Sequence, residues 1–468
     1  MRGRARFARF AATASVLLAS LAASPSAGPG ARRAGEGARG GAPPPRSDTR
    51  SRTPAAPASA LARALAEDAR TLVGADQGVY VEAADGTVLV AQAASRAVHP
   101  ASVSKVPTTL ALLRALGPDH RFETRFSAAG WIEDGVLQGN LLVEASGDPF
   151  FVDENALVVL LALRELGLER VAGNLVAKGP LLFDWKREAA AARLRAALEG
   201  RVPESAWRAV RAHDGGGGDD ARDGVGRPSG AGRASAAPQP PAKSGAPRVA
   251  GPPALRFGRA AASGAGPARV LVTHRSQPLL PLVKALNGYS NNIFAPFADA
   301  AGGIGAVERV ARASVPAAFR GEIVLGDGAG ANPRNRLSPR AAVALIRALD
   351  EELARHGASL ADVLPVAGVD EGTLRHRLDG PGERAHVVAK TGTYGSYGAC
   401  ALAGAVRGRS GTVYFAILNR GVAIDPARRR QDAFVRALLV ALDTEPWPYR
   451  RDDAPAFTRA EVRAASAP

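Results

Sequence analysis

The chain of 468 residues is 46% apolar, enough for a substantial core, while aromatic residues make up only 5%. Its single cysteine, Cys400, excludes an intrachain disulfide and a cysteine-rich zinc site. The net charge is +16, and residues 1–55 supply half of it with ten arginines against two acids. The rest is spread without a dense basic run, so we expect a solvated basic surface and no nucleic-acid partner. Peripheral contact with a membrane or an anionic wall surface fits the same charge.

The start of the chain has the pattern of a targeting segment. In residues 1–27, four arginines precede an apolar stretch at 10–23, and small residues follow. This pattern predicts a secretory signal peptide and an exported protein of the periplasm or cell envelope, with an uncleaved anchor as the alternative. Residues 28–58 consist mainly of Ala, Gly, Pro, Arg and Ser, which predicts a disordered linker, and similar composition predicts a disordered segment at 213–253.

Between these segments the periodicities are those of a globular protein. Apolar spacing predicts helices at 60–72, 106–116, 155–166, 279–286, 341–356 and 425–442. Turn signals and short apolar runs predict strands at 79–81, 88–90, 141–143, 386–389, 399–406 and 413–418. Strands at both ends of the chain predict an α+β domain with one antiparallel sheet between helices. We expect this discontinuous domain at 59–128 and 275–448, an inserted region at 129–274, and a C-terminal tail at 449–468.

A serine and a lysine stand at the start of the second predicted helix. Ser102 precedes Lys105 by three residues, so both side chains lie on one helix face. A serine hydroxyl needs a nearby base, and a lysine whose charge is destabilised can serve. Backbone N–H groups at a helix start can stabilise an oxyanion. Alone, this pattern equally fits a helix start capped by serine.

Two further short motifs follow along the chain. Ser290 and Asn292 form a Ser-x-Asn motif after a predicted helix. The run from Lys390 through Thr391 and Gly392 to Thr393 ends a predicted strand. Each has an ordinary explanation as a polar turn, but the ordered set of three on the expected elements is far more specific.

With these motifs the chain resembles the D-alanyl-D-alanine carboxypeptidase/endopeptidase family, also called class C penicillin-binding proteins. Further similar stretches are 116–124, 146–149, 364–370 and 372–374. The resemblance implies a transpeptidase/β-lactamase-like antiparallel sheet sandwiched by helices, with domains inserted between the first two motifs. Here that interval is 188 residues from Ser102 to Ser290, which predicts a reduced inserted region.

The resemblance also implies a two-step acyl transfer on peptidoglycan stem peptides ending in D-Ala-D-Ala. Ser102 would attack, Lys105 would take its proton, Ser290 would relay it, and Asn292 would hold the peptide. Lys390, expected at the mouth of the site, would keep Lys105 neutral and attract the substrate carboxylate. Thr391 and Thr393 would bind that carboxylate, Gly392 would admit the substrate backbone, and β-lactams would acylate Ser102 as covalent inhibitors.

Three other residues carry open alternatives. Asp148 either binds a diaminopimelate amino group or caps a turn. Arg334 stands one position after the place where the family's peptide-recognition arginine is expected. His99 is close to Ser102 but is expected to pack beneath the loop, because no Gly-x-Ser-x-Gly elbow accompanies it. No cofactor is expected, since the chain lacks a phosphate loop and a metal-ligand spacing.

Two other functions remain as alternatives. A serine β-lactamase or esterase of the same superfamily would share the chemistry and change the substrate. A non-catalytic wall-binding homologue would keep only the fold, although intact Ser102, Lys105 and Lys390 argue against it. The balance between carboxypeptidase and endopeptidase action depends on the inserted region and cannot be inferred from these motifs.

Overall fold

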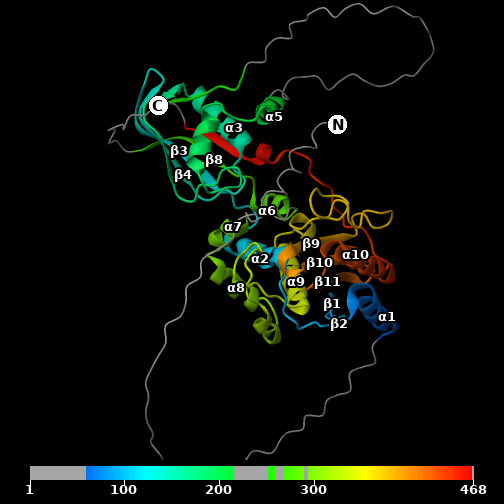
Figure 1. Ribbon diagram of the computed structural model, residues 1–468. Helices are drawn as coiled ribbons and strands as arrows, with labels where there is room; N and C mark the ends of the chain where they lie inside the picture. Colours follow the sequence, from blue (N-terminus) through cyan, green and yellow to red (C-terminus); the bar gives the residue numbers. More distant parts are fainter. Residues whose placement is uncertain (1–58, 215–250, 259–267, 289–293, 466–468) are drawn as a thin grey trace, which may run out of the picture. The chain divides into compact units, whose positions relative to one another are not determined.

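The computed structural model describes residues 59–214, 251–258, 268–288 and 294–465, which form two β-sheets with their helices (Figure 1). The first sheet has the strand order β2-β1-β11-β10-β9 and is antiparallel throughout. Its strands are β1 (Gly78–Ala83), β2 (Val88–Gln92), β9 (Val387–Tyr394), β10 (Ala399–Gly408) and β11 (Gly411–Asn419). Because β1 and β2 come from one end of the chain and β9 to β11 from the other, the predicted discontinuous sheet is confirmed.

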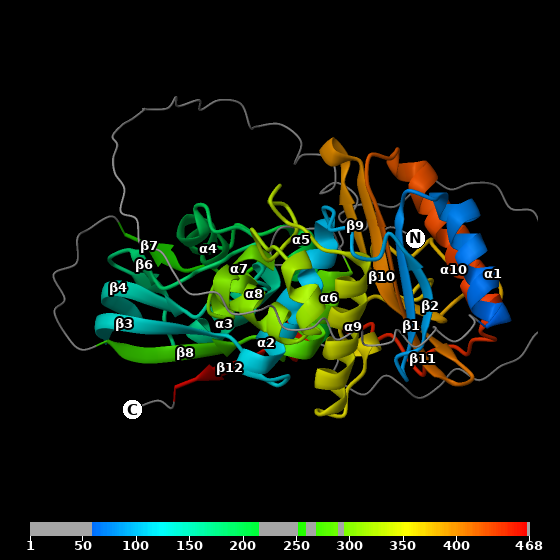
Figure 2. The same cartoon turned by 90° about the horizontal axis from the view of Figure 1, so that it is seen from below.

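Helices cover both faces of this sheet (Figure 2). On one face, Val387 and Ala389 pack in a core with Leu65 and Phe434. On the other face, Val388 belongs to a core with the central helix. The alternation along β9 therefore assigns successive residues to opposite faces. The helices of the first face are α1 (Ala60–Asp68), its π-helical extension (Ala69–Gly74) and α10 (Ile424–Ala441).

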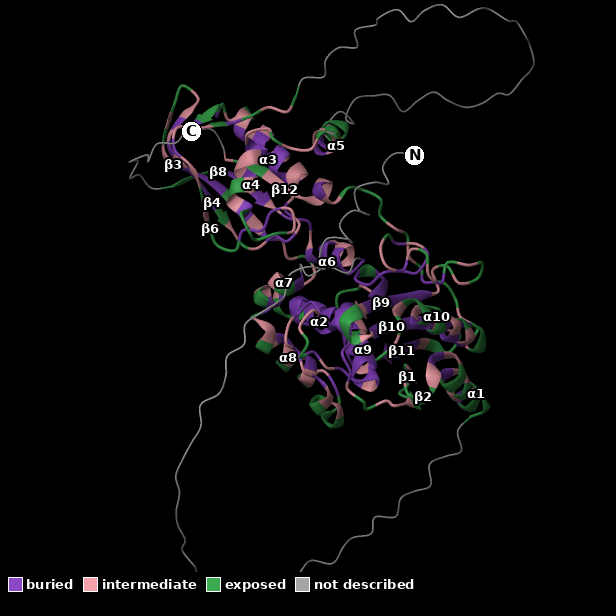
Figure 3. Ribbon diagram, in the orientation of Figure 1, coloured by how far each residue is buried: buried purple, intermediate pink, exposed green. Residues whose placement is uncertain are grey.

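The second face meets a layer of helices that includes the one carrying Lys105. These helices are α2 (Lys105–Leu116), α6 (Leu279–Asn287), α7 (Phe294–Ala300), α8 (Ile304–Ala313) and α9 (Pro339–Ala354). Residues 105–113 of α2 are all buried, which places it in the middle of the core (Figure 3). Short 3₁₀ turns complete the domain at Ala101–Ser104, Ala317–Glu322, Leu360–Asp362 and Gly395–Tyr397. The predicted fold, an antiparallel sheet sandwiched by helices, is confirmed.

A second sheet of seven strands occupies the inserted region. Its order is β12-β8-β3-β4-β5-β7, and β6 pairs with β4. The strands are β3 (Glu123–Glu133), β4 (Val136–Ala145), β5 (Arg170–Val171), β6 (Leu175–Lys178), β7 (Arg256–Phe257), β8 (Arg269–Arg275) and β12 (Glu461–Ala464). Helices α3 (Asp153–Glu165), α4 (Ala190–Leu198) and α5 (Glu204–Asp214) pack on one face and form a separate apolar core.

The observed sheets differ from the predicted boundaries in three places. The sequence predicts that residues 123–128 belong to the discontinuous catalytic domain, but in the structure they begin β3 of the second sheet. The predicted tail contributes a 3₁₀ turn (Ala456–Arg459) and strand β12, which pairs antiparallel with β8. The four residues of β12 are too few to show a periodicity, and the strand forms through its pairing with β8, so the sequence did not predict it. Helix α5 extends through Asp214, so residues 213–214 at the start of the predicted disordered segment are helical. Residues 215–250, and the predicted signal and linker at 1–58, lie outside the described residues.

Candidate active site

The side chains of Ser102 and Lys105 meet at the start of the central helix. Ser102 lies in a 3₁₀ turn that continues directly into α2, so the three-residue spacing places both side chains on one face. Lys105 Nζ donates a hydrogen bond of 2.8 Å to Ser102 Oγ. Ser102 is 6% exposed and Lys105 is fully buried. The hydroxyl therefore has an amine in contact with it and little competing solvent.

The surroundings of Lys105 favour its neutral form. Burial, followed by the charge of Lys390, lowers the pKa of Lys105 well below its ordinary value, while Asp327 opposes this. Its Nζ also donates to Ala329 O at 3.2 Å and lies 5.5 Å from the centre of the Phe294 ring. A neutral lysine amine has a lone pair that can accept the proton of the serine hydroxyl. The arrangement can therefore activate Ser102 by general-base catalysis.

Two glycines allow the backbone before Ser102 to lie against its neighbours. Ala101 has φ +48°, a left-handed conformation that is strained for a residue with a Cβ. A Cβ on Gly330 would overlap Ala101 O, and a Cβ on Gly392 would lie 2.6 Å from Pro100 O. The turn that presents Ser102 is therefore held between these two glycines. The resemblance implies that Gly392 admits the substrate backbone; in the structure Gly392 lies against the turn that carries Ser102.

Lys390 and Gly392 lie on the face of β9 that meets this turn. Lys390 is completely buried rather than at an open mouth, and burial lowers its pKa to about 7. Its Nζ donates to Thr391 O at 3.1 Å. At neutral pH the charge of Lys390 is therefore only partial, and a bound carboxylate would restore it. β9 is the edge strand of the sheet, and the segment before it covers its first half: Ala367 N donates to Val387 O at 2.9 Å, and Ala389 N donates to Pro365 O at 3.0 Å.

The two threonines of the third motif are held by residues that the sequence motifs do not include. Thr391 Oγ1 donates to Thr373 Oγ1 at 2.7 Å. Arg428 in α10 donates through Nη2 to Thr393 Oγ1 at 3.1 Å. Thr373 lies in the stretch 372–374 that resembles the family, whereas Arg428 belongs to no sequence motif. Thr373 is 18 positions from Thr391, and Arg428 is 35 positions from Thr393, so these contacts become evident only in the folded structure.

A loop that precedes α9 supports the Lys105 contact. In this loop Asp327 accepts hydrogen bonds from the backbone N–H groups of Gly330, Ala331 and Asn332 at 2.7, 3.0 and 2.8 Å. These bonds fix the segment whose Ala329 carbonyl accepts from Lys105. Because the backbone oxygen of Ala329 makes this contact, the contact does not depend on the side chain at position 329.

His99 packs beneath the loop, as the sequence indicated. Its Nδ1 accepts from Ala101 N at 3.2 Å, and its Nε2 lies 3.0 Å from Asn332 O. These partners assign the proton to Nε2, because a carbonyl can only accept. The ring stacks on Tyr397 with 5.5 Å between centres, and burial lowers its pKa. Both nitrogens are engaged with the backbone, so His99 positions the turn before Ser102.

The second motif falls outside the described residues, which omit 289–293 and so include neither Ser290 nor Asn292. The residues on either side do reach the cluster. Gly288 O accepts from Thr373 N at 2.9 Å, and the ring of Phe294 contacts Lys105. The roles of Ser290 and Asn292 stay predictions.

The remaining predicted residues lie apart from the Ser102 cluster in their described contacts. Asp148 is buried in the inserted region, where its Oδ1 accepts from Phe150 N at 2.8 Å and its Oδ2 lies 3.9 Å from His274 Nδ1. This contact fits the turn-capping alternative. Arg334 is exposed, and its backbone N–H donates to Asn332 Oδ1 at 2.9 Å.

No group of three or more His, Cys, Asp or Glu side chains that could hold a metal ion was found in the described part of the chain. Among the helices that the structure describes, none is long and apolar enough to cross a bilayer.

Comparison with known families tests the resemblance directly. The model of the D-Ala-D-Ala carboxypeptidase 3 (S13) family matches residues 58–188 and 257–439, more than half of the chain. The chain belongs to this family. The S13 match excludes 189–256, which includes the predicted disordered segment.

One curated relative and two solved structures are also similar to this chain. The D-alanyl-D-alanine carboxypeptidase DacB of Haemophilus influenzae is 37% identical over 76 residues, and the match spans only 16% of that protein and 16% of this chain. The Bdellovibrio bacteriovorus predatory endopeptidase Bd0816 has a TM-score of 0.61 at 21% identity, covering 82% of this chain and 97% of that one. The penicillin G-acylated predatory endopeptidase Bd3459 of the same organism has a TM-score of 0.57 at 20% identity, covering 82% and 96%. At these identities the structural likeness shows the fold.

Proposed function

We propose that this S13 chain is a serine-type D-Ala-D-Ala carboxypeptidase that acts on peptidoglycan stem peptides, with DD-endopeptidase action on the cross-links as the second candidate activity. The observation that carries the proposal is the 2.8 Å hydrogen bond between a buried Lys105 amine and Ser102 Oγ. The substrate class comes from the family, whose members are D-Ala-D-Ala carboxypeptidases. Because peptidoglycan lies outside the cytoplasm, we propose that the protein acts in the periplasm or cell envelope.

The proposed first step is attack of Ser102 Oγ on the carbonyl carbon of the D-Ala-D-Ala bond. Neutral Lys105 takes the hydroxyl proton as the C–O bond forms. The oxyanion is stabilised by the backbone N–H groups of Ser102 and Thr393, and losing one such donor typically costs about 100- to 1000-fold in rate. The proton then passes, with Ser290 as the relay, to the leaving amine as the peptide bond breaks.

The second step hydrolyses the acyl-enzyme. Water attacks the Ser102 ester, a proton returns through Lys105 to Ser102 Oγ, and the shortened peptide leaves as the acid.

Before the first step, the carboxylate of the terminal D-Ala is held by Lys390 together with Thr391 and Thr393, and Asn292 binds the substrate amide. A β-lactam presents a similar carbonyl and carboxylate, and the neighbour Bd3459 is described in a penicillin G-acylated form. We therefore propose β-lactams as covalent inhibitors here.

The test is digestion of purified peptidoglycan with mass analysis of the products. Carboxypeptidase action releases free D-Ala, while endopeptidase action converts cross-linked dimers to monomers, so the two activities give different masses. Lys105→Met should abolish both, since methionine has no amine to accept the proton of the serine hydroxyl. A chromogenic cephalosporin is assayed in parallel, and rapid turnover of it with no release of D-Ala would contradict the proposal and indicate a β-lactamase.

A further inference from the structure

The solvent-facing side of the second sheet carries a repeated charge pattern on three neighbouring strands. Strands β3, β8 and β12 contribute Glu123-Thr124-Arg125, Thr273-His274-Arg275 and Glu461-Val462-Arg463. Their register aligns Glu123, Arg275 and Glu461 in one row across the strands, and Arg125, Thr273 and Arg463 in the next. Thr124 and His274 are buried, so the charged side chains project to the opposite face, away from the helices.

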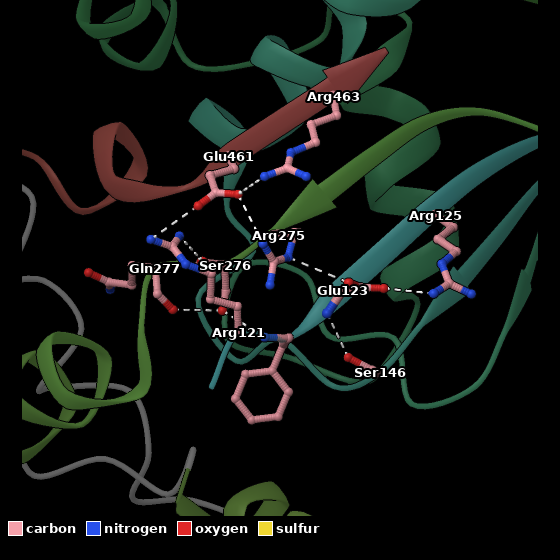
Figure 4. A network of polar contacts seen from close by, with 10 residues as sticks. Arg121, Glu123, Arg125, Ser146, Arg275, Ser276, Gln277, Glu461 and Arg463 are labelled. Atoms are coloured by element: carbon pink, nitrogen blue, oxygen red, sulfur yellow. Dashed lines mark hydrogen bonds and ion pairs between the residues drawn. The ribbon is translucent and has the colours of Figure 1, made fainter. Parts of the chain in front are cut away.

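The charges of the first row largely neutralise one another. Arg275 lies 3.5 Å from Glu123 and 3.1 Å from Glu461, and Arg121 approaches Glu461 at 3.4 Å. Figure 4 shows this chain of ion pairs crossing the three strands. The row therefore needs no outside ligand to balance it.

The second row is different, because each of its two arginines makes a single ion pair among the residues that the structure describes. Arg125 contacts Glu123 at 2.8 Å and Arg463 contacts Glu461 at 3.1 Å, each through Nη2 to a residue of its own strand. Their side chains are 54% and 70% exposed. Between them, on the central strand, stands the hydroxyl of Thr273. Arg–Thr–Arg is a set of hydrogen-bond donors suited to a carboxylate or phosphate.

This row lines a hollow of about 330 Å³. Its charged lining consists of Arg125, Arg275, Arg463 and Glu123, which leaves an excess of two positive charges. Glu144, the cross-strand neighbour of Arg125, does not line it. Outer strands of a three-strand set lie about 10 Å apart, so two arginine side chains can converge on one anion above the middle strand.

An exposed aromatic residue on the same face indicates the kind of polymer. Trp131 of β3 is 61% exposed, whereas its neighbour Ile132 packs against the core, so Trp131 faces the side that bears Arg125. An amphipathic indole suits a sugar ring, which a polyphosphate chain does not offer. We propose that this face binds peptidoglycan strands through residues other than those of the Ser102 site, with a stem-peptide carboxylate held between Arg125 and Arg463. The choice of peptidoglycan as the polymer rests on the proposed function, whereas the binding site itself contains none of the proposed catalytic residues.

The experiment is co-sedimentation of the full chain with insoluble peptidoglycan freed of phosphate-containing polymers. A Ser102→Ala background prevents digestion during the measurement. Arg125→Gln with Arg463→Gln should weaken binding about tenfold, the size expected for losing two exposed charge-assisted contacts. The matched control is Arg70→Gln with Arg208→Gln, which removes two exposed arginines that likewise pair with a nearby glutamate. It should bind like the parent.

Conversion of the wall carboxylates to amides should reduce parent binding to the level of the double variant. Unchanged binding by the double variant, equal binding to amidated walls, or binding only to walls that retain phosphate polymers would each overturn the inference. Penicillin acylation of the double variant with Ser102 intact is measured separately. It should equal that of wild type, which shows that the fold is retained and separates failure of this site from failure of the proposed chemistry.

Discussion

Replacing Asp148 by asparagine should stabilise the protein by an amount that grows as the pH rises from 4 to 7. Burial raises the pKa of Asp148 from 3.8 to about 7, with only the hydrogen bond from Phe150 N acting in the other direction. Folding at neutral pH therefore has to protonate or desolvate a carboxylate that is ionised in the unfolded chain. At about 1.4 kcal/mol per tenfold change, the cost reaches about 4 kcal/mol at pH 7.

The neighbouring His274 explains why the wild type hides this effect. Burial lowers the pKa of His274 from 6.5 to about 3. Between pH 4 and 6.5 the folded pair carries one proton on Asp148, and the unfolded pair carries one on His274. The proton count is equal, so this pair gives the wild type no pH dependence there. In Asp148→Asn only His274 titrates. It is neutral in the folded state and protonated in the unfolded state, so the free energy of unfolding of this variant rises with pH up to about 6.5.

Urea unfolding of wild type and Asp148→Asn at several pH values between 4 and 8 measures the difference. The introduced amide retains an oxygen that can accept from Phe150 N, so the turn is preserved. The control variant His274→Gln should show the opposite slope, losing stability as pH rises from 4 to 7. A difference that does not vary with pH, or an Asp148→Asn protein less stable than wild type near pH 5, would refute the reasoning. The latter result would indicate an ion pair in the folded state.

Three further predictions concern the Ser102 site and use penicillin acylation rates. Gly392→Ala should slow acylation at least 100-fold, because its Cβ would lie 2.6 Å from Pro100 O, whereas Gly395→Ala, with open space around it, should have no effect. The rate should rise with pH as Lys105 loses its proton and fall above about pH 7 as Lys390 loses its own, and a rate that keeps rising to pH 9 would contradict this. Thr373→Val should slow acylation several-fold by removing the acceptor for Thr391, with no added effect from Thr391→Val if the pair acts as a unit.

Local patterns predicted the elements that carry strong periodicity. The predicted helix at 106–116 is observed at Lys105–Leu116, and the predicted strand at 399–406 is observed at Ala399–Gly408. The same periodicity placed Ser102 and Lys105 on one helix face, where the structure joins them by a hydrogen bond. These features depend on neighbours within one or two turns of the chain, which is the range over which a sequence pattern is informative.

Features that depend on distant partners were not predictable in this way. The Ala329 carbonyl that receives Lys105 has no side-chain signature, and Asp327 orders its loop only through backbone N–H groups. The burial of Lys390 follows from the turn at Ser102 packing on Gly392, a contact between segments nearly 300 residues apart. Strand β12 depends wholly on pairing with β8.

The most direct test of the account is intact-mass analysis after incubation with penicillin G. The wild-type chain should gain the mass of one penicillin, and peptide mapping should locate it on Ser102. Ser102→Ala should gain nothing, while Ser104→Ala, a buried serine two positions away whose hydroxyl has no hydrogen-bond partner among the described residues, should still be acylated. An adduct on Ser102→Ala, or none on the wild type, would contradict the assignment of Ser102 as the nucleophile.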